Sequence, residues 1–455
     1  MRYITRDKNY YQSLVRLAIP VSLQGLITFL VNFADNLMVN SLGDAAVSGV
    51  YMGNQIHTLI QMFTSGIGGA IVILSAQYWG KQDTERIQSL VAIGLRISVT
   101  VGLCFTAVCL LVPEPIIRFF TEDPAVIAEG VTYLRIVCFS YAFFCVTQAL
   151  ISAMRSVEVA RIGMWVSFIS LFVNIGLNYV LIFGKLGFPA MGVKGAALAT
   201  VLSRMAETCV ILYYVCIRDK KLLFKLPCIA LKDKLLTKDF FKYGLPLVAG
   251  EIVWSVNMMM NSRILGGYGA AVITAASVVN TLNSLAYITI SGLASAVGII
   301  TGKTIGAGKT ELMKEYAYTT QILFLGVGLF SGTLVYLVSG PFIGLYGGIS
   351  AEAARQSMLF ARVLCVTIMG TSYQMPCLFG LVKSGGDISF VFRNDTIFVF
   401  CVVLPSAMIA SYLGAPAWVT FACLKCDQIL KCLVAVVKIN RFNWMKNLTQ
   451  AKKAT

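Results

Sequence analysis

Long apolar runs recur along the whole chain and alternate with short breaks that contain charged, Gly or Pro residues. The runs extend over about 20 residues or more, the length that an α-helix needs to cross a hydrocarbon core of about 30 Å. We therefore predict an all-α polytopic membrane protein with twelve transmembrane helices. The predicted helices span residues 14–41, 45–78, 91–112, 131–154, 162–184, 190–217, 244–265, 270–301, 316–340, 353–382, 389–413 and 415–439.

The distribution of basic residues gives these helices an orientation. If the N-terminus is cytoplasmic, the cytoplasmic segments contain 25 Lys and Arg, whereas the opposite loops contain only three, Arg118, Lys185 and Lys194. Cytoplasmic loops are enriched in Lys and Arg, and a single miscounted helix would destroy this asymmetry. The sequence therefore predicts twelve spans with both termini in the cytoplasm.

Composition agrees with this class and limits the partners. Hydrophobic residues make up 57% of the chain and charged residues 13%, compared with about 25% charged residues in soluble domains. The net charge is +16, and most of the basic residues lie in the predicted cytoplasmic segments. The positive charge therefore indicates the topology and an attraction to anionic lipid, not nucleic-acid binding. We expect a monomer in the lipid bilayer and no nucleic-acid partner.

The two halves of the chain form an internal repeat. With a constant offset of 226, residues 20–80 align without gaps with residues 246–306, and Pro, Gly and Asn recur at matched positions. Further on, "MRSVEV" (154–159) aligns with "VKSGGD" (382–387). We predict two pseudo-symmetric six-helix lobes. The N-lobe covers residues 1–217, a cytoplasmic amphipathic linker 218–243, the C-lobe 244–440 and a cytoplasmic tail 441–455.

Because each lobe has an even number of helices, the two repeats share one orientation in the membrane. A body of two such lobes is typical of secondary transporters that work by alternating access. The sequence contains no G-x-x-x-x-G-K-[ST] phosphate-binding loop, which argues against ATP hydrolysis by this chain. We expect transport driven by an ion gradient, with no cofactor.

Cysteine and histidine usage argues against a metal or redox centre. The thirteen cysteines lie mostly in apolar runs, for example Cys104, Cys138 and Cys209, and we interpret them as small buried hydrophobic residues. One C-x-x-C pair lies within the last helix, without a second pair or a neighbouring histidine. The chain has one histidine, which also argues against a histidine-based hydrolase.

Five acidic residues fall within predicted helices: Asp35, Glu207, Glu251, Asp395 and Asp427. Such residues are expensive in a membrane, and each needs a partner, a proton or a function.

Spacing along the helix suggests partners for three of these acids. Glu207 lies three residues after Arg204, and Asp427 lies four residues before Lys431, so both are predicted to form intrahelical pairs. Asp395 has no suitable partner on its own helix, and we expect a cross-helix pair with Arg362 or Lys431.

Asp35 differs from these three acids. No basic residue lies within one helical turn of it, although three amides, Asn32, Asn36 and Asn40, are close in sequence. A carboxylate with amide oxygens suits a hard cation such as Na⁺. Burial could instead favour a proton on the carboxylate. The structural alternative is an aspartate that is permanently hydrogen-bonded between helices.

The motifs together resemble one family. "ADNLMVNSLG", "NQIHTLIQMFTSGIGGAIVILSAQYWG", "VNIGLNYVLIFGKLGFPAMGVKGAALAT" (173–200) and "LVKSGGDISF" (381–390), with Asp395 and Pro405, are similar to segments of bacterial multidrug and toxic compound extrusion (MATE) transporters of the MOP flippase superfamily. The resemblance covers essentially the whole chain. It implies a V-shaped pair of six-helix lobes in the bacterial cytoplasmic (inner) membrane. The implied activity is antiport of drug-like, cationic amphipathic compounds against Na⁺ or H⁺.

The resemblance also implies an ion site in the N-lobe. Asp35 matches the family's first-helix aspartate, which binds the coupling ion or proton, and Asn174 matches an asparagine of that site. One turn later the family often has a second aspartate, where this chain has Asn178. A site with two carboxylates is therefore not implied, and Asp35 is the one obvious acid for Na⁺ or a proton.

The C-lobe offers further candidates. Glu251 lies five residues past Pro246, near the place where some MATE branches have a functional glutamate. We list it with Asp395 as a possible coupling or substrate residue, and a protonated, hydrogen-bonded glutamic acid is the alternative. Four flexible or aromatic side chains are candidates for an adaptable substrate cleft: Met258, Met259, Tyr373 and Met375.

Two other functions stay open from the sequence. A lipid-linked oligosaccharide flippase of the same superfamily would need clustered Lys and Arg in its interior, whereas the basic residues within the helices of this chain are scattered. A membrane-embedded enzyme would usually need a clustered acid or metal motif, for which one histidine leaves little material. We expect a transporter, not an enzyme.

Overall fold

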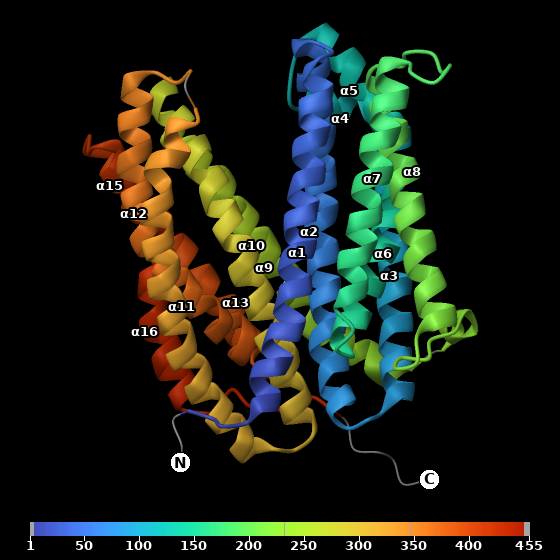
Figure 1. Cartoon of the computed structure of the whole chain (residues 1–455), viewed down its shortest axis with the longest axis vertical. Helices are drawn as coiled ribbons and strands as arrows, with labels where there is room; N and C mark the ends of the chain where they lie inside the picture. Colours follow the sequence, from blue (N-terminus) through green and yellow to red (C-terminus); the bar gives the residue numbers. More distant parts are fainter. Residues whose placement is uncertain (1–3, 232, 347, 450–455) are drawn as a thin grey trace. The chain divides into compact units, whose positions relative to one another are not determined.

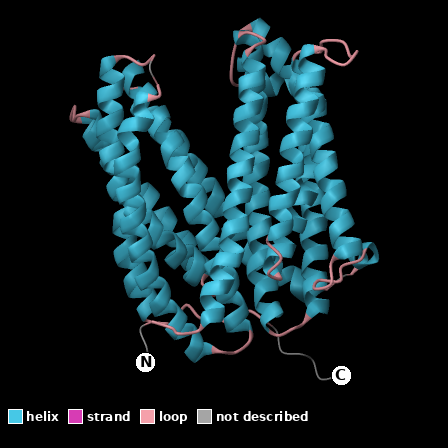
Figure 2. Ribbon diagram, viewed as in Figure 1, coloured by secondary structure: helices cyan, strands magenta, loops and turns pink. Residues whose placement is uncertain are grey.

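The computed structural model describes residues 4–231, 233–346 and 348–449. Within these residues the chain consists of helices joined by loops, and no strand is present (Figure 2). The helices before the midpoint are α1 Lys8–Asn40, α2 Asp44–Gly80, α3 Thr84–Leu111, α4 Pro113–Arg118, α5 Pro124–Val137, α6 Ser140–Ser156, α7 Arg161–Phe183, α8 Val193–Tyr213 and the π-helix η1 Tyr214–Arg218 (Figure 1).

The remaining helices begin with a short 3₁₀-helix, η2 Leu226–Ala230. The others are α9 Lys234–Gly266, α10 Ala270–Gly306, α11 Thr310–Gly344, α12 Ala351–Met375, the π-helix η3 Pro376–Lys383, α13 Ile388–Ile397, the π-helix η4 Phe398–Val403, α14 Leu404–Tyr412, α15 Ala417–Lys425 and α16 Asp427–Asn440.

Helical segments occupy all twelve predicted positions. Nine helices in the described part of the chain are long and apolar enough to cross a membrane, and α5 with α6, bent by 52°, would form a tenth span. The remaining two positions fail this test for different reasons. The helix α9 is continuous, but polar residues such as Glu251 and Asn257 interrupt its apolar run. The span predicted at 415–439 is divided between two short helices, α15 and α16.

One helix begins earlier than predicted. The sequence predicts a helix from residue 244, but α9 begins at Lys234. Asp233 stabilises this start, because its Oδ1 accepts hydrogen bonds from the backbone N–H of Leu235 (2.9 Å) and Leu236 (3.0 Å). Leu236 and Phe240 are buried, so the added turns have an apolar face that packs against the protein.

The chain divides into two compact units. The N-terminal unit comprises Leu23–Val248, and the C-terminal unit comprises the residues up to Ser22 together with those from Ala249 onward. The helices α1 and α9 each contain an internal proline, Pro20 and Pro246. Each of these helices belongs to one unit up to the second residue after its proline, and to the other unit from there on. The predicted division into lobes at residues 217 and 244 stays a prediction.

Small residues allow close helix packing within the N-terminal unit. A Cβ added to Gly102 on α3 would lie 2.7 Å from the Cα of Ala142 on α6. One added to Gly49 on α2 would lie 2.7 Å from the backbone nitrogen of Gly130 on α5. Glycine is therefore required at both crossings, as expected where packing between membrane helices depends on small residues.

The predicted burial of cysteines is partly wrong. Cys138 and Cys365 are buried, whereas Cys104, Cys209 and Cys401 are exposed on the protein surface. The physical reason is that an apolar run in a membrane helix has no obligation to face the protein interior, since lipid is as apolar as the core.

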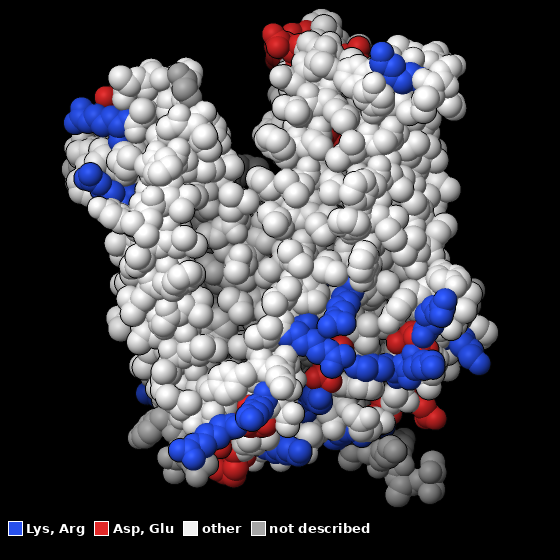
Figure 3. All heavy atoms as spheres, in the orientation of Figure 1, with Lys and Arg blue, Asp and Glu red and all other residues white. Residues whose placement is uncertain are grey.

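On one face of the protein, exposed charged side chains are rare along the middle of the helices (Figure 3). On the face that Figure 3 shows, Lys and Arg gather toward the helix ends, and the long middle stretches are nearly free of charge. This is the surface of a multi-pass membrane protein, because a charge on the lipid-facing side of a helix would be costly.

Candidate functional site

The three residues predicted for the N-lobe ion site lie together in the N-terminal unit. Asn178 Nδ2 donates a hydrogen bond of 2.5 Å to Asp35 Oδ1 on α1 and one of 3.2 Å to Asn174 Oδ1. Asn174 and Asn178 lie one turn apart on α7, and each is only 2% exposed. A polar pair on the buried face of α7 therefore holds the carboxylate of α1.

One atom of this group lacks a partner. Asn178 Oδ1 is buried and, among the described residues, accepts no hydrogen bond. A buried unsatisfied carbonyl oxygen is unusual and calls for an explanation such as an ion or a proton donor. Because it belongs to the residue that contacts Asp35, a hard cation held by carboxylate and amide oxygens fits the donor set.

The amides that are close to Asp35 in sequence do not extend this group. Asn32, Asn36 and Asn40 are all exposed. Their spacing along α1 directs them away from the buried face, so the amide oxygens near Asp35 come from α7.

Sequence reasoning missed two neighbours of Asp35. Tyr133 on α5 is 4% exposed and donates a 3.1 Å hydrogen bond to Asn54 Oδ1 on α2. The charge of Arg204 on α8 acts on Asp35 and on Tyr133. No local spacing could have indicated these neighbours, because they lie on two other helices, α5 and α8.

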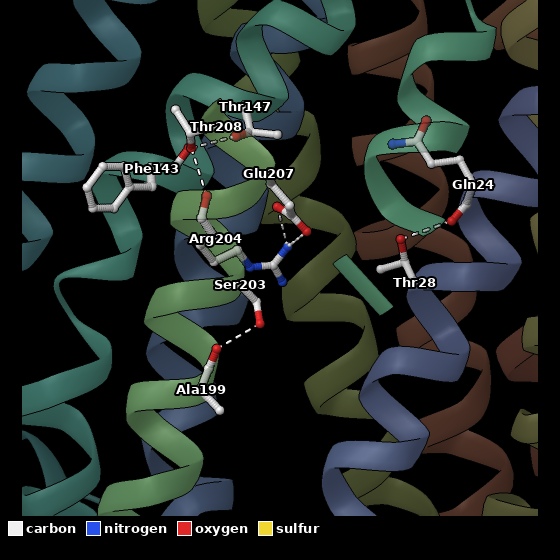
Figure 4. Close-up of polar contacts among 9 residues, drawn as sticks. All are labelled: Gln24, Thr28, Phe143, Thr147, Ala199, Ser203, Arg204, Glu207 and Thr208. Carbon is white, nitrogen blue, oxygen red and sulfur yellow. Dashed lines mark hydrogen bonds and ion pairs between the residues drawn. The ribbon is translucent and has the colours of Figure 1, made fainter. Parts of the chain in front are cut away.

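Arg204 forms the intrahelical pair that the sequence predicts. Its Nη1 lies 2.9 Å from Glu207 Oε1 and 3.0 Å from Oε2 (Figure 4). Its guanidinium carbon lies 5.0 Å from the centre of the Phe144 ring, and that ring lies 4.8 Å from the ring of His57. The one histidine of the chain is thus half-buried and lies next to an aromatic ring that also contacts a permanent cation.

A second group of charges lies in the C-terminal unit. Lys431 Nζ on α16 lies 2.8 Å from Asp395 Oδ1 on α13 and 3.0 Å from Asp427 Oδ2. The predicted pair of Asp427 with Lys431 is confirmed, and Lys431, not Arg362, is the cross-helix partner of Asp395. One lysine thus bridges two acids in a low-dielectric interior, which stabilises all three charges.

Glu251 has a basic neighbour that sequence reasoning missed. Lys383, at the end of η3, acts electrostatically on Glu251, and Asp395 acts on both. Glu251 and Asp395 also act on Tyr287 of α10. Glu251, Lys383, Asp395 and Tyr287 therefore form one electrostatic neighbourhood within the C-terminal unit.

The repeat carries a signal for this neighbour. Lys383 aligns with Arg155, whose Nη2 donates a 2.6 Å hydrogen bond to Gln24 Oε1 on α1. Gln24 lies four residues after Pro20, and Glu251 lies five residues after Pro246. The two repeats thus share a feature. In each, a basic residue of the aligned segment, Arg155 or Lys383, acts on a side chain about one turn past the proline, Gln24 or Glu251.

The residues predicted for a substrate cleft have unlike environments. Tyr373 is buried and donates a 3.1 Å hydrogen bond to Gln321 Oε1 on α11, and Met375 packs against the core of the C-terminal unit. Met258 is half-buried, whereas Met259 is 72% exposed. Their role in a cleft stays a prediction.

Comparison with protein families decides the identity. The model of one family, MatE, matches residues 20–180 and again residues 246–412. The chain belongs to the MatE family. The two matches begin at Pro20 and Pro246, the offset of 226 found in the internal repeat. The resemblance to MATE transporters drawn from the motifs is thereby confirmed.

Curated MATE proteins resemble the chain over most of their length. The probable multidrug resistance protein NorM of Thermotoga maritima is 25% identical over 74% of this chain and 72% of its own. The multidrug resistance protein NorM of Vibrio vulnificus is 23% identical over 91% of this chain and 90% of its own.

Solved MATE structures share the fold. A Vibrio cholerae MATE transporter superposes with a TM-score of 0.88 and 15% identity, covering 97% of this chain and 98% of its own. A MOP superfamily transporter from Pyrococcus furiosus gives 0.84 and 20% identity, covering 95% and 96%. The predicted fold class, an all-α membrane protein of twelve helices in two six-helix lobes, is confirmed. This MATE protein is a multi-pass membrane transporter.

Proposed function

We propose that this MATE transporter exports drug-like, cationic amphipathic compounds in exchange for Na⁺ or H⁺ by alternating access. Relatives that carry the name multidrug resistance protein support the substrate class. The observation that carries the coupling role is the hydrogen bond between the half-buried Asp35 and the buried Asn178, whose Oδ1 has no partner among the described residues. Asp35, Asn174 and Asn178 are the proposed ion or proton site.

Coupling requires only that the ion and the drug favour different conformations of the transporter. Neutralising Asp35 by a cation or a proton changes the electrostatic balance on α1. The helix α1 belongs to one unit up to the second residue after Pro20 and to the other unit from there on. A change around Asp35 therefore acts on a helix that both units share. This supports α1 as the element that transmits the state of the ion site.

Glu251 and Asp395 are proposed as the acidic residues of the C-terminal unit that take part in coupling or attract a cationic substrate. With Asp427 these are three acids, and three bases lie in the same neighbourhood, Lys383, Lys425 and Lys431. Met258 and Met259 remain candidates for adaptable apolar contacts with the substrate.

The decisive experiment is efflux of a fluorescent organic cation from cells that express Asp35→Asn. We expect efflux to fall to the level of cells without the transporter, because the neutral amide can neither release a proton nor attract a cation. Asp44→Asn is the matched control, since Asp44 is an exposed acid at the start of α2. Undiminished, ion-dependent efflux by Asp35→Asn at equal abundance would refute the coupling role.

The coupling ion follows from a second measurement. Efflux is followed under an imposed Na⁺ gradient with the pH gradient collapsed, and then with the gradients reversed. Drug export that follows one gradient alone identifies that ion. We expect the protein in the bacterial cytoplasmic membrane with both termini inside, and active as a monomer.

A further inference from the structure

Two glycines lie at equivalent helix crossings, one in each unit. In the C-terminal unit, a Cβ added to Gly292 on α10 would lie 2.9 Å from the backbone nitrogen of Ser22 on α1. In the N-terminal unit, a Cβ added to Gly66 on α2 would lie 2.9 Å from the backbone nitrogen of Val248 on α9. At both crossings the glycine therefore lets two helix backbones approach closely.

The internal repeat relates these two crossings. Gly66 aligns with Gly292, and Ser22 aligns with Val248, at the constant offset of 226. The same contact, between a glycine and the second residue after a helix proline, thus exists twice in the chain. Because a serine faces one glycine and a valine faces the other, the two crossings share the close approach of the backbones and not a particular side-chain contact.

The crossings coincide with the points where α1 and α9 pass from one unit to the other. Ser22 is the last residue of α1 in the C-terminal unit, and Val248 is the last residue of α9 in the N-terminal unit. Pro20 and Pro246 lie two residues before these points. A proline in a helix interior removes one backbone hydrogen bond and makes a bend less costly. Each helix therefore has a weak point and a close crossing within one turn of each other.

Each of these helices is held at its two ends by different units. The start of α1 is held in the C-terminal unit, where the Tyr10 hydroxyl forms a hydrogen bond with α11. The later part of α1 is held in the N-terminal unit by the hydrogen bond between Asp35 and Asn178. In α9 the order is reversed, since Phe240 is buried in its first part and Leu265 belongs to the core of the C-terminal unit. Any movement of one unit against the other must be absorbed between these ends, in both helices.

We propose that Gly292 and Gly66 are the pivots on which α1 and α9 tilt when the transporter changes conformation. A glycine presents no side-chain ridge that interlocks with the facing helix, so the angle between the helices changes with little steric resistance. A methyl group at the crossing would favour one angle and raise the barrier to others. The two glycines are thus positioning residues that act through α1 and α9. This inference rests on the proposed function, because it assumes alternating access.

A role in close packing alone makes a different prediction. Gly102 on α3 is packed as tightly as the proposed pivots, since a Cβ there would lie 2.7 Å from the Cα of Ala142 on α6. Both of these helices lie wholly within the N-terminal unit. If Gly292 only permits close packing, alanine at position 102 or 292 should lower the stability without a specific effect on the conformational change. If Gly292 is a pivot, alanine at position 292 slows the conformational change and alanine at position 102 does not.

The experiment measures how fast single transporters change conformation. Two fluorescent dyes are attached through unnatural amino acids at Phe188 and Tyr412, exposed positions in different units, and energy transfer between them is recorded in lipid nanodiscs. We expect Gly66→Ala and Gly292→Ala to slow the interconversion of the two conformations about tenfold or more. The turnover rate of organic-cation efflux should fall with it, while KM stays within about twofold. Gly102→Ala is the matched control and should keep the interconversion rate of the parent.

A relocated glycine separates a slower pivot from a misfolded protein. Ser22→Gly combined with Gly292→Ala removes the side-chain atom nearest to the new methyl group, the Oγ of Ser22, and keeps one glycine at the crossing. We expect this double variant to interconvert faster than Gly292→Ala alone. The Tm and the amount of folded protein are measured for every variant. If one of the two pivot variants does not fold, the other still tests the proposal, because the two crossings are equivalent.

Three results would overturn the inference: interconversion at the rate of the parent in both pivot variants, equal slowing in Gly102→Ala, or a parent that keeps one dye distance with and without ions and substrate. Its failure differs from failure of the proposed function. If efflux depends on Asp35 but the pivot variants interconvert like the parent, only the pivots are refuted. If the pivot variants slow the interconversion but the parent exports no organic cation under any ion gradient, only the proposed transport activity is refuted.

Discussion

At the scale of single residues, the site around Asp35 depends on one amide group. The NH₂ group of Asn178 donates hydrogen bonds to Asp35 and to Asn174 at the same time. This orients the carboxylate of Asp35 and leaves the carbonyl oxygen of Asn178 without a partner among the described residues. The amide thus fixes the acid and, in the proposed ion site, would offer an oxygen to the ion.

Replacing Asn178 by alanine tests this double role. The variant removes a hydrogen bond to a charged group, which contributes about 1.5–3 kcal/mol, and it removes a possible ligand. We expect the ion concentration for half-maximal efflux to rise about tenfold or more. Asn36→Ala, an exposed amide next to Asp35 in sequence, is the control and should leave this concentration unchanged. Equal behaviour of the two variants would contradict the role of Asn178.

At the scale of elements, the segment after α16 is fixed to the loop between η3 and α13. Trp444 is 0% exposed, and its indole N–H donates to the backbone oxygen of Ile439. The backbone N–H of Lys446 donates to the oxygen of Gly385 at 2.7 Å. At Gly386 φ is +103°, and a Cβ would lie 2.8 Å from the Lys446 oxygen, so only glycine fits there.

Asp387 in this loop joins the segment to α16. Its carboxylate lies 2.8 Å from Lys446 Nζ and 2.7 Å from Lys438 Nζ. Burial raises the pKa of Asp387, but the two lysines outweigh burial, and the pKa lies below its ordinary value. A carboxyl group with a lowered pKa stabilises the fold above its ordinary pKa, and this contribution disappears as the pH falls through the lowered pKa.

We therefore expect Asp387→Asn to lower the Tm by about 1–3 °C near neutral pH. The difference from the parent should stay constant from pH 8 down to about pH 5 and shrink as the pH approaches the ordinary pKa of about 3.9. Thermal unfolding in detergent measures it. Glu311→Gln, which breaks an exposed 2.7 Å pair with Lys314, should have a smaller effect. A difference that grows on acidification would contradict the stabilising role of the ionised carboxyl group.

At the scale of the whole molecule, the two units exchange the starts of their first helices. The start of α1 belongs to the C-terminal unit, which consists mainly of the second half of the chain. Tyr10 hydroxyl lies 2.8 Å from Thr320 Oγ1 on α11, and the backbone N–H of Thr5 donates to Thr319 Oγ1 at 2.8 Å. The corresponding first part of α9 belongs to the N-terminal unit. Each unit thus contains the start of the other repeat's first helix, and neither is built from one continuous half of the sequence.

The distribution of basic residues predicts the orientation of the whole molecule. We expect a C-terminal green fluorescent protein fusion to fluoresce in bacterial cells, because the predicted orientation places the C-terminus in the cytoplasm. Alkaline phosphatase inserted between α7 and α8, at residue 187, should be active, because that loop is on the opposite side. An insertion between α2 and α3, at residue 82, is the control and should be inactive. The reverse pattern would refute the orientation.

The positions of the twelve helices could be predicted from the sequence, because an apolar run of sufficient length must be helical and must cross the bilayer. Some boundaries could not. The start of α9 depends on the cap at Asp233 and on the burial of Leu236 and Phe240, which no hydropathy pattern contains. For the same reason the exposed Cys104 could not be told from the buried Cys138, since both lie in apolar runs.

The sequence by itself determined that this protein is helical and membrane-spanning, that it is built from a repeat, and that Asp35 is a charge that needs an explanation. Only the tertiary structure decided what surrounds that charge. Asn178 lies 143 residues away along the chain from Asp35, and Arg204, whose charge acts on it, lies on yet another helix. Hydrophobic length and helical spacing are local properties, whereas the partner of a buried charge depends on how separate helices pack.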